Sequence, residues 1–165
     1  METPEAPESG ARFSGRQAFQ DAVRETIEQA ADHALPWMFW CDPDFADWPL
    51  RERVVVEALQ RWALGGGRLR MLASDFRGVQ QHAARFVTWR RQWDHRFEAR
   101  SSGRSRGGDT PCVLLTQEKM LLRLAPEVHV FVWTSDRARR TQMADQLESL
   151  WQQSVSAFPA TTLGL

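Results

Sequence analysis

The chain has 165 residues, 42% hydrophobic and 25% charged, with a formal net charge of zero. This length and composition predict one domain with a substantial core, and no apolar run approaches the roughly 20 residues that cross a bilayer. We therefore expect a cytoplasmic protein that has no membrane partner.

The N-terminal segment is acidic, contains prolines and lacks the basic start and apolar stretch of a signal peptide. We expect residues 1–11 to be a disordered leader, residues 12–158 to be the folded domain and residues 159–165 to be a flexible tail. Ser14–Gln17 has the form of a capping box, with a hydroxyl first and a glutamine three residues later. A helical stripe follows, made of Phe19, Val23, Ile27 and Ala31.

The next segments alternate between strand and helix patterns. Leu35–Trp40 is an apolar run that predicts a buried strand, and the aspartate-rich 41–49 segment predicts a loop. A second helical stripe runs from Val54 to Trp62, and the three glycines at 65–67 are expected to stop this helix.

The central part predicts a strand at Arg68–Ser74, one helix over residues 78–92 and a short strand at Arg96–Ser101. A mobile loop rich in Ser, Gly and Arg should follow over 101–109.

The last third predicts two strands of a hairpin, Val113–Thr116 and Met120–Leu124, which turn at residues 117–119. A further strand at His129–Thr134 precedes a final helix over 137–154, which Ser135 or Asp136 can cap. This order predicts an α/β fold in which a mixed β-sheet has helices on both faces.

Three of these segments resemble one half of a phospholipase D-like domain. Gly67–Leu72 is similar to the family's Gly-x-x-Val-Arg-x-Leu strand, and Gln117–Lys119 resembles its Asp-Gly-Lys turn. Thr134–Arg137 stands where the family has a Gly-Ser-x-Asn turn, with the asparagine replaced by arginine. The resemblance spans about residues 12–155 and implies a single phospholipase D-like half.

The family's catalytic motif is degenerate in this chain. Active members carry His-x-Lys-x4-Asp on the strand before the turn, and the corresponding residues here are Thr110, Cys112 and Gln117. In the family, the histidine forms a covalent phospho-enzyme, the lysine holds phosphate charge and the acid orients its histidine. Threonine, cysteine and glutamine supply none of these functions, so we expect no phosphodiesterase chemistry by this mechanism.

The resemblance therefore implies a non-catalytic binding or regulatory domain. Single halves of the family generally pair as dimers, so a homodimer is expected. Degenerate single halves also occur in bacteria, as domains of unknown function beside acetyltransferase domains. A partner enzyme such as an acetyltransferase is thus a second expectation.

Nucleic-acid binding is an alternative, because the charges are unevenly distributed. Residues 1–60 carry a net charge of −7 and residues 61–140 carry +9. The 85–106 segment combines seven arginines with aromatic residues, a chemistry that grips phosphate backbones and stacks on bases. A solvated helix face, with Trp89 and Trp93 in the core, explains the same pattern. The ligand-binding candidates are Arg90, Arg91, Arg96, Arg100, Arg104, Arg106, Ser135, Arg137 and Arg140.

A divergent phosphodiesterase-like enzyme is a further alternative, which requires Cys112, His129 or Asp109 to converge in one pocket. The two cysteines, Cys41 and Cys112, form no disulfide framework and are expected to be buried free thiols. The four histidines show no metal-ligand spacing, so no metal or cofactor is expected.

Overall fold

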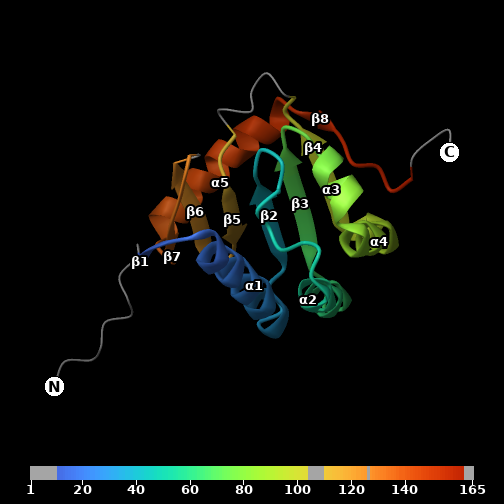
Figure 1. Ribbon diagram of the computed structural model, residues 1–165, viewed down its shortest axis with the longest axis horizontal. Helices are drawn as coiled ribbons and strands as arrows, with labels where there is room; N and C mark the ends of the chain where they lie inside the picture. Colours follow the sequence, from blue (N-terminus) through green and yellow to red (C-terminus); the bar gives the residue numbers. More distant parts are fainter. Residues whose placement is uncertain (1–10, 104–109, 126, 162–165) are drawn as a thin grey trace.

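The computed structural model describes residues 11–103, 110–125 and 127–161 (Figure 1). Ten of the eleven residues of the predicted leader, most of the predicted 101–109 loop and the last four residues of the predicted tail lie outside the described residues. Arg104, Arg106 and Asp109 are therefore also outside them.

The described elements follow the expected alternation of helix and strand. The strands are β1 (Ala11–Ser14), β2 (Trp37–Cys41), β3 (Arg68–Ala73), β4 (Phe97–Ser101), β5 (Val113–Thr116), β6 (Met120–Ala125), β7 (Val128–Thr134) and β8 (Val155–Ser156). The helices are α1 (Arg16–Asp32), α2 (Arg53–Leu64), α3 (Arg77–His82), α4 (Ala84–Gln92) and α5 (Arg137–Gln152), with a 3-10 turn at Asp94–Arg96.

The strands that the structure describes form one eight-stranded mixed sheet, in the order β1-β7-β6-β5-β2-β3-β4-β8. Strands β2, β3 and β4 are parallel neighbours, and the remaining pairs are antiparallel. Parallel neighbours require crossover connections, which α2 and the α3–α4 pair provide. The predicted mixed α/β sheet is thus confirmed.

Helices cover both faces of this sheet, as predicted. Along β2, Met38 and Trp40 point into the core beneath α1, α2 and α4, whereas Phe39 and Cys41 point into a second core beneath α5. This alternation follows from the two-residue period of a strand. Figure 1 shows α5 crossing behind the sheet, on the side opposite to α1 and α2.

The start of α1 differs from the predicted capping box. Ser14 belongs to β1, where it pairs with Val130 of β7, and Gly15 is the residue that precedes the helix. Gly15 has a φ of 106°, a conformation that side chains disfavour, so glycine makes the sharp change from strand to helix possible. The serine hydroxyl therefore caps nothing.

The predicted helix over 78–92 is two helices. It breaks at Ala83, whose φ of −120° and ψ of 61° are not helical. The break lets Val79 of α3 and both Phe86 and Trp89 of α4 enter the same core. Helical spacing alone cannot show such a break, because the apolar residues keep their period on both sides of it.

Two other local predictions are confirmed. The β5–β6 hairpin turns at residues 117–118, where the Thr116 N–H donates to the Lys119 carbonyl at 2.8 Å. At the start of α5, the Asp136 side chain accepts a hydrogen bond from the Arg139 N–H at 3.0 Å. Within the described ranges, no helix is long and apolar enough to span a membrane.

Candidate functional site

One edge of the sheet collects the ends of several strands. The parallel strands β2, β3 and β4 end there, and β5 begins there because it runs antiparallel to β2, with Cys41 opposite Val113. We call this the carboxyl edge. Because ligands of open α/β sheets bind outside the carboxyl ends of the strands, a site is expected here first.

Three hydroxyl side chains meet at the carboxyl edge. Ser74 Oγ lies 3.0 Å from Thr110 Oγ1, and Ser101 Oγ donates to the Ser74 carbonyl at 2.8 Å. The Gly103 N–H donates to Ser101 Oγ at 3.2 Å. The Thr110 hydroxyl is therefore hydrogen-bonded within the protein.

Cys112 lies beside a buried carboxyl group, that of Asp42. The two residues are 4% and 3% exposed, and Asp42 accepts hydrogen bonds from the N–H groups of Phe45 and Asp44 at 2.7 and 3.1 Å. Burial raises the pKa of the Cys112 thiol, and the Asp42 charge raises it further. Burial also raises the pKa of Asp42, although hydrogen bonds to its carboxylate oppose this. The thiol is therefore protonated near neutral pH, when it is a poor nucleophile.

Two arginines form ion pairs with the two carboxylates at this edge. Arg123 Nη2 lies 3.8 Å from Asp42 Oδ1, and its Nη1 lies 3.6 Å from Asp47 Oδ2. Arg16 Nε, from α1, lies 3.0 Å from Asp47 Oδ1. The charged side chains thus neutralise one another and leave Arg123 engaged within the fold.

Gln117 lies at the opposite end of β5. Arg140 of α5 donates to the Gln117 carbonyl, and it also donates to the Ser135 carbonyl at 3.3 Å. The structure therefore brings Gln117, Ser135 and Arg140 together, and it separates them from Thr110 and Cys112 by the length of the strand. Arg137, at the first position of α5, is exposed.

The other candidates for divergent chemistry do not join Cys112 in the described structure. His129 is an exposed residue at the start of β7, and its ring centroid lies 6.3 Å from that of Phe131. In the described ranges, no group of three or more His, Cys, Asp or Glu side chains is placed to hold a metal ion.

Among the predicted ligand-binding arginines that the structure describes, Arg90 is the most buried, with 5% of its surface exposed. Its Nε donates to the Phe158 carbonyl at 2.8 Å, and its Nη1 donates to Asp94 at 2.7 Å. The guanidinium also lies 4.5 Å from the ring centroid of Phe97. Arg90 thus links α4, β4 and the segment after β8.

Other arginines of the 85–106 segment donate to backbone carbonyl groups. Arg91 donates to Ala160 at 3.1 Å, Arg96 to Gly66 at 2.8 Å and Arg100 to Trp151 at 3.1 Å. The tryptophans between them are also engaged, since Trp89 is buried and Trp93 donates to Gln60 at 2.7 Å. Several arginine side chains of this segment therefore donate hydrogen bonds within the protein and stabilise the fold.

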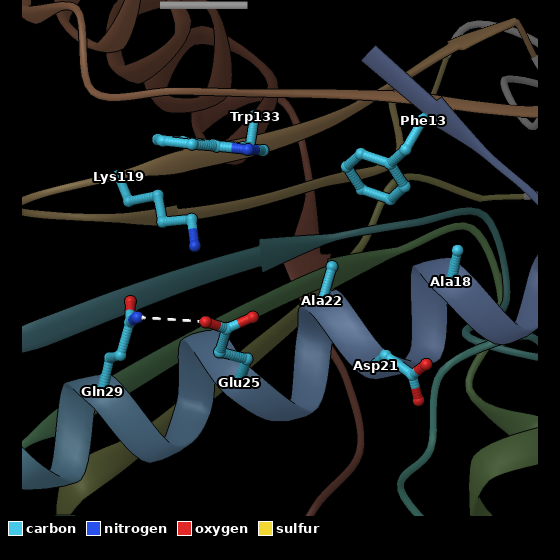
Figure 2. Close-up of a pocket in the computed structure, with 8 residues that line it drawn as sticks. All are labelled: Phe13, Ala18, Asp21, Ala22, Glu25, Gln29, Lys119 and Trp133. Atoms are coloured by element: carbon cyan, nitrogen blue, oxygen red, sulfur yellow. Dashed lines mark hydrogen bonds between the residues drawn. The ribbon is translucent and has the colours of Figure 1, made fainter. Parts of the chain in front are cut away.

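A pocket of about 530 Å³ lies between α1 on one side and β1, β7 and the β5–β6 turn on the other (Figure 2). Its lining residues are Phe13, Ala18, Asp21, Ala22, Glu25, Gln29, Lys119 and Trp133. Figure 2 shows Lys119 Nζ pointing into the space between Trp133 and Glu25, and Nζ lies 5.0 Å from the Trp133 ring centroid. Burial lowers the pKa of Lys119, against the charge of Glu25.

Local sequence patterns do not predict this pocket because its walls come from β1, α1, the β5–β6 turn and β7. Strand β1 was not predicted, and nothing local joins it to β7. Lys119, which lines the pocket, is the single lysine among 21 basic residues, but this count alone does not indicate a pocket.

Comparison with known proteins shows which solved structures have a similar fold. No protein-family model matches the chain, and no curated protein matches its sequence. NucT from Helicobacter pylori has a similar structure, with a TM-score of 0.57 and 8% identity over 90% of this chain and 98% of that chain. Nuc from Salmonella typhimurium, a phospholipase D family member, gives a TM-score of 0.56 and 8% identity over 81% of this chain and 90% of that chain. The fold is phospholipase D-like.

A third solved structure is also similar. TrmBL2, an archaeal chromatin protein with a novel mode of DNA binding, gives a TM-score of 0.67 and 14% identity over 93% of this chain. The phospholipase D-like chain spans 56% of that protein's length. At these identities the likeness establishes the fold alone.

Proposed function

We propose that this phospholipase D-like domain is a binding or regulatory module without phosphodiesterase activity. The observation that carries the proposal is the state of the carboxyl edge. Thr110 is hydrogen-bonded to Ser74, and Cys112 is a buried, neutral thiol beside Asp42. An attack on phosphorus needs an activated nucleophile and a group that neutralises phosphate charge. Thr110 and Cys112 supply neither an activated nucleophile nor a group that neutralises phosphate charge.

Hydrolysis of bis(4-nitrophenyl) phosphate and of labelled single-stranded DNA tests this proposal. We expect the wild-type rate to equal the rates of Thr110→Val and Cys112→Ala and the rate without protein. A variant rate about tenfold or more below the wild-type rate would show that the carboxyl edge is catalytically active. Glu57→Gln, at an exposed position of α2, is the matched control. It also detects a contaminating enzyme, whose activity would persist in every preparation.

We propose nucleic-acid binding as a second function, because residues 61–140 carry a net charge of +9 and TrmBL2 is a DNA-binding protein of similar fold. Arg137 and Arg139 are exposed at the start of α5 and are suitable for a test. Arg90 is unsuitable because it is buried.

Fluorescence anisotropy with labelled oligonucleotides across a salt series tests this second function. Changing Arg137→Gln and Arg139→Gln together should weaken binding. It should also reduce the salt slope, the steepness with which the logarithm of the binding constant falls with the logarithm of the salt concentration, by about 0.7–0.9 for each lost phosphate contact. Arg53→Gln, at an exposed position of α2, should leave the affinity and the salt slope unchanged. Absence of binding at low salt would exclude the function.

We further propose that the domain pairs with a second copy, or else with a partner enzyme such as an acetyltransferase. The end of the β6–β7 hairpin exposes two large apolar residues, Leu124 at 44% and Val128 at 48%. Exposed apolar side chains that lie together favour a protein contact.

Light scattering should give twice the chain mass for the wild type, and the variant with both Leu124→Asp and Val128→Asp should give the mass of one chain. A monomeric wild type at about 100 µM, a concentration well above the Kd of a stable dimer, would contradict the homodimer.

A further inference from the structure

Lys119 presents a cation to the pocket between α1 and β7 without a bonding partner. Within the described residues, its Nζ has no ion pair or hydrogen bond, and its close neighbour is the face of Trp133 at 5.0 Å. The side chain is partly buried, so its ammonium has lost some hydration. A cation in this state gains most from a ligand anion, because charge-assisted hydrogen bonds are the strong ones.

The carboxylates across the pocket are not equally available. Asp21 already accepts hydrogen bonds from Arg24 at 2.7 Å and from Gln17 at 3.0 Å, and the Arg24 bond lowers its pKa. Glu25 lies one helical turn further and accepts one long hydrogen bond, 3.5 Å, from Gln29 among the described residues. Glu25 is therefore the carboxylate that a ligand cation can reach (Figure 2).

Apart from Gln29, the remaining lining residues are apolar. Ala18 and Ala22, four residues apart on α1, lie across from the rings of Phe13 and Trp133 (Figure 2). The small alanine side chains leave space beneath the rings, and Phe13 is itself held by stacking on Phe131, with a centroid separation of 5.6 Å. The volume of about 530 Å³ is within the range of small-molecule sites.

We propose that this pocket binds a zwitterionic α-amino acid that has a large apolar side chain. The ligand carboxylate pairs with Lys119, its ammonium pairs with Glu25, and its side chain fills the space between Ala22 and the aromatic rings. A simple anion would be repelled by Glu25 and a simple cation by Lys119, so a ligand with both charges fits both groups. Lys119 lies at the opposite end of β5 from the carboxyl edge, and the pocket shares no lining residue with the contacts described at that edge. This inference therefore does not depend on the proposed function.

Calorimetric titration of the wild-type protein with three related compounds tests the ligand class. L-phenylalanine carries both charges, 3-phenylpropanoate lacks the ammonium and phenethylamine lacks the carboxylate. We expect L-phenylalanine to bind about tenfold or more tightly than either analogue. Equal affinities, or no binding of L-phenylalanine at about 10 mM, a concentration that detects even weak millimolar binding, would overturn the proposal.

Variants test the two charged contacts. Lys119→Met and Glu25→Gln should each weaken L-phenylalanine binding about tenfold, whereas Asp145→Asn, exposed on α5, should leave it unchanged. Because Lys119 is the chain's one lysine, lysine labelled with carbon-13 at Cε alone gives one NMR signal in the unaltered protein. This signal should shift on saturation with L-phenylalanine, and a signal that stays in place would refute the site even if a variant failed to fold.

Discussion

The guanidinium of Arg90 is part of the core. It meets a carboxylate one helical turn away, a backbone carbonyl of the C-terminal segment and two aromatic rings, those of Phe97 and Phe158. A buried charge is tolerated when hydrogen bonds and a counter-charge replace its lost hydration. Removing this side chain would leave the Phe158 carbonyl without its donor and a space beside the rings.

Arg90→Ala should therefore lower the free energy of unfolding by about 3 kcal/mol. The neighbouring Arg91→Ala, which removes an exposed side chain, should cost about 0.5 kcal/mol or less. Urea unfolding followed by circular dichroism measures both values. Equal losses would contradict the structural role of Arg90.

Both thiols should be unreactive in the folded protein. Burial raises the pKa of Cys41 and of Cys112, and in each case the charge of Asp42 adds to the effect. Because the thiolate is the reactive form, iodoacetamide at about pH 8, near the ordinary thiol pKa, should label neither residue in the native state and both in urea. Raising the pH should speed labelling of the unfolded chain alone. Rapid labelling of native Cys112 would show that the thiol is activated.

At the scale of elements, the turn from α2 to β3 depends on close packing of a glycine. Gly66 has a φ of 102°, which favours glycine, and Gly67 lies against the indole of Trp62. A Cβ at Gly67 would overlap the ring of Trp62, which is buried and donates to the Leu35 carbonyl at 2.7 Å. The indole therefore has no room to move away.

Gly67→Ala should lower the free energy of unfolding by about 2–3 kcal/mol, because the added methyl overpacks the turn. Gly78→Ala is the matched control, since its Cβ would meet open space within α3. This substitution should stabilise the protein by about 0.5 kcal/mol, because alanine favours the helix. Thermal unfolding of the two variants distinguishes them, and a stable Gly67→Ala protein would contradict the described packing.

The sequence predicted the elements whose patterns are long and local. The stripe of α1 and the apolar run of β2 show their period directly, and the glycines after α2 mark its end. The short edge strands β1 and β8 were missed because two to four residues carry too little pattern. Their positions depend on pairing with β7 and β4, which are distant in the chain.

The candidate site was predictable only in part, for a related reason. The burial of Cys112 followed from its apolar surroundings in the sequence. Its neighbour Arg123 comes from β6, and Asp42 and Ser74, the partner of Thr110, directly follow β2 and β3. Their positions are fixed by the sheet order. The separation of Ser135 from Thr110 likewise becomes visible only when the direction of β5 is known.

At the scale of the whole molecule, the two ends of β5 have different character. At the carboxyl edge the hydroxyl groups are hydrogen-bonded to one another and the charged side chains form ion pairs. At the end with the β5–β6 turn, the Lys119 ammonium has no hydrogen bond or ion pair to the described residues and faces an open pocket. A phospholipase D-like sheet is thus combined with a carboxyl edge that has no activated group among its described residues. Binding at the other end is compatible with this arrangement.

Intact-protein mass spectrometry tests most directly whether the carboxyl edge has lost phosphodiester chemistry. The protein is mixed with excess phosphodiester substrate and quenched in acid, so that a covalent phospho-enzyme is trapped even if it turns over slowly. The structure predicts an unchanged mass for the wild type and for Cys112→Ala. A mass increase equal to one phosphoryl-containing group in the wild type, absent from Thr110→Val or Cys112→Ala, would contradict the account.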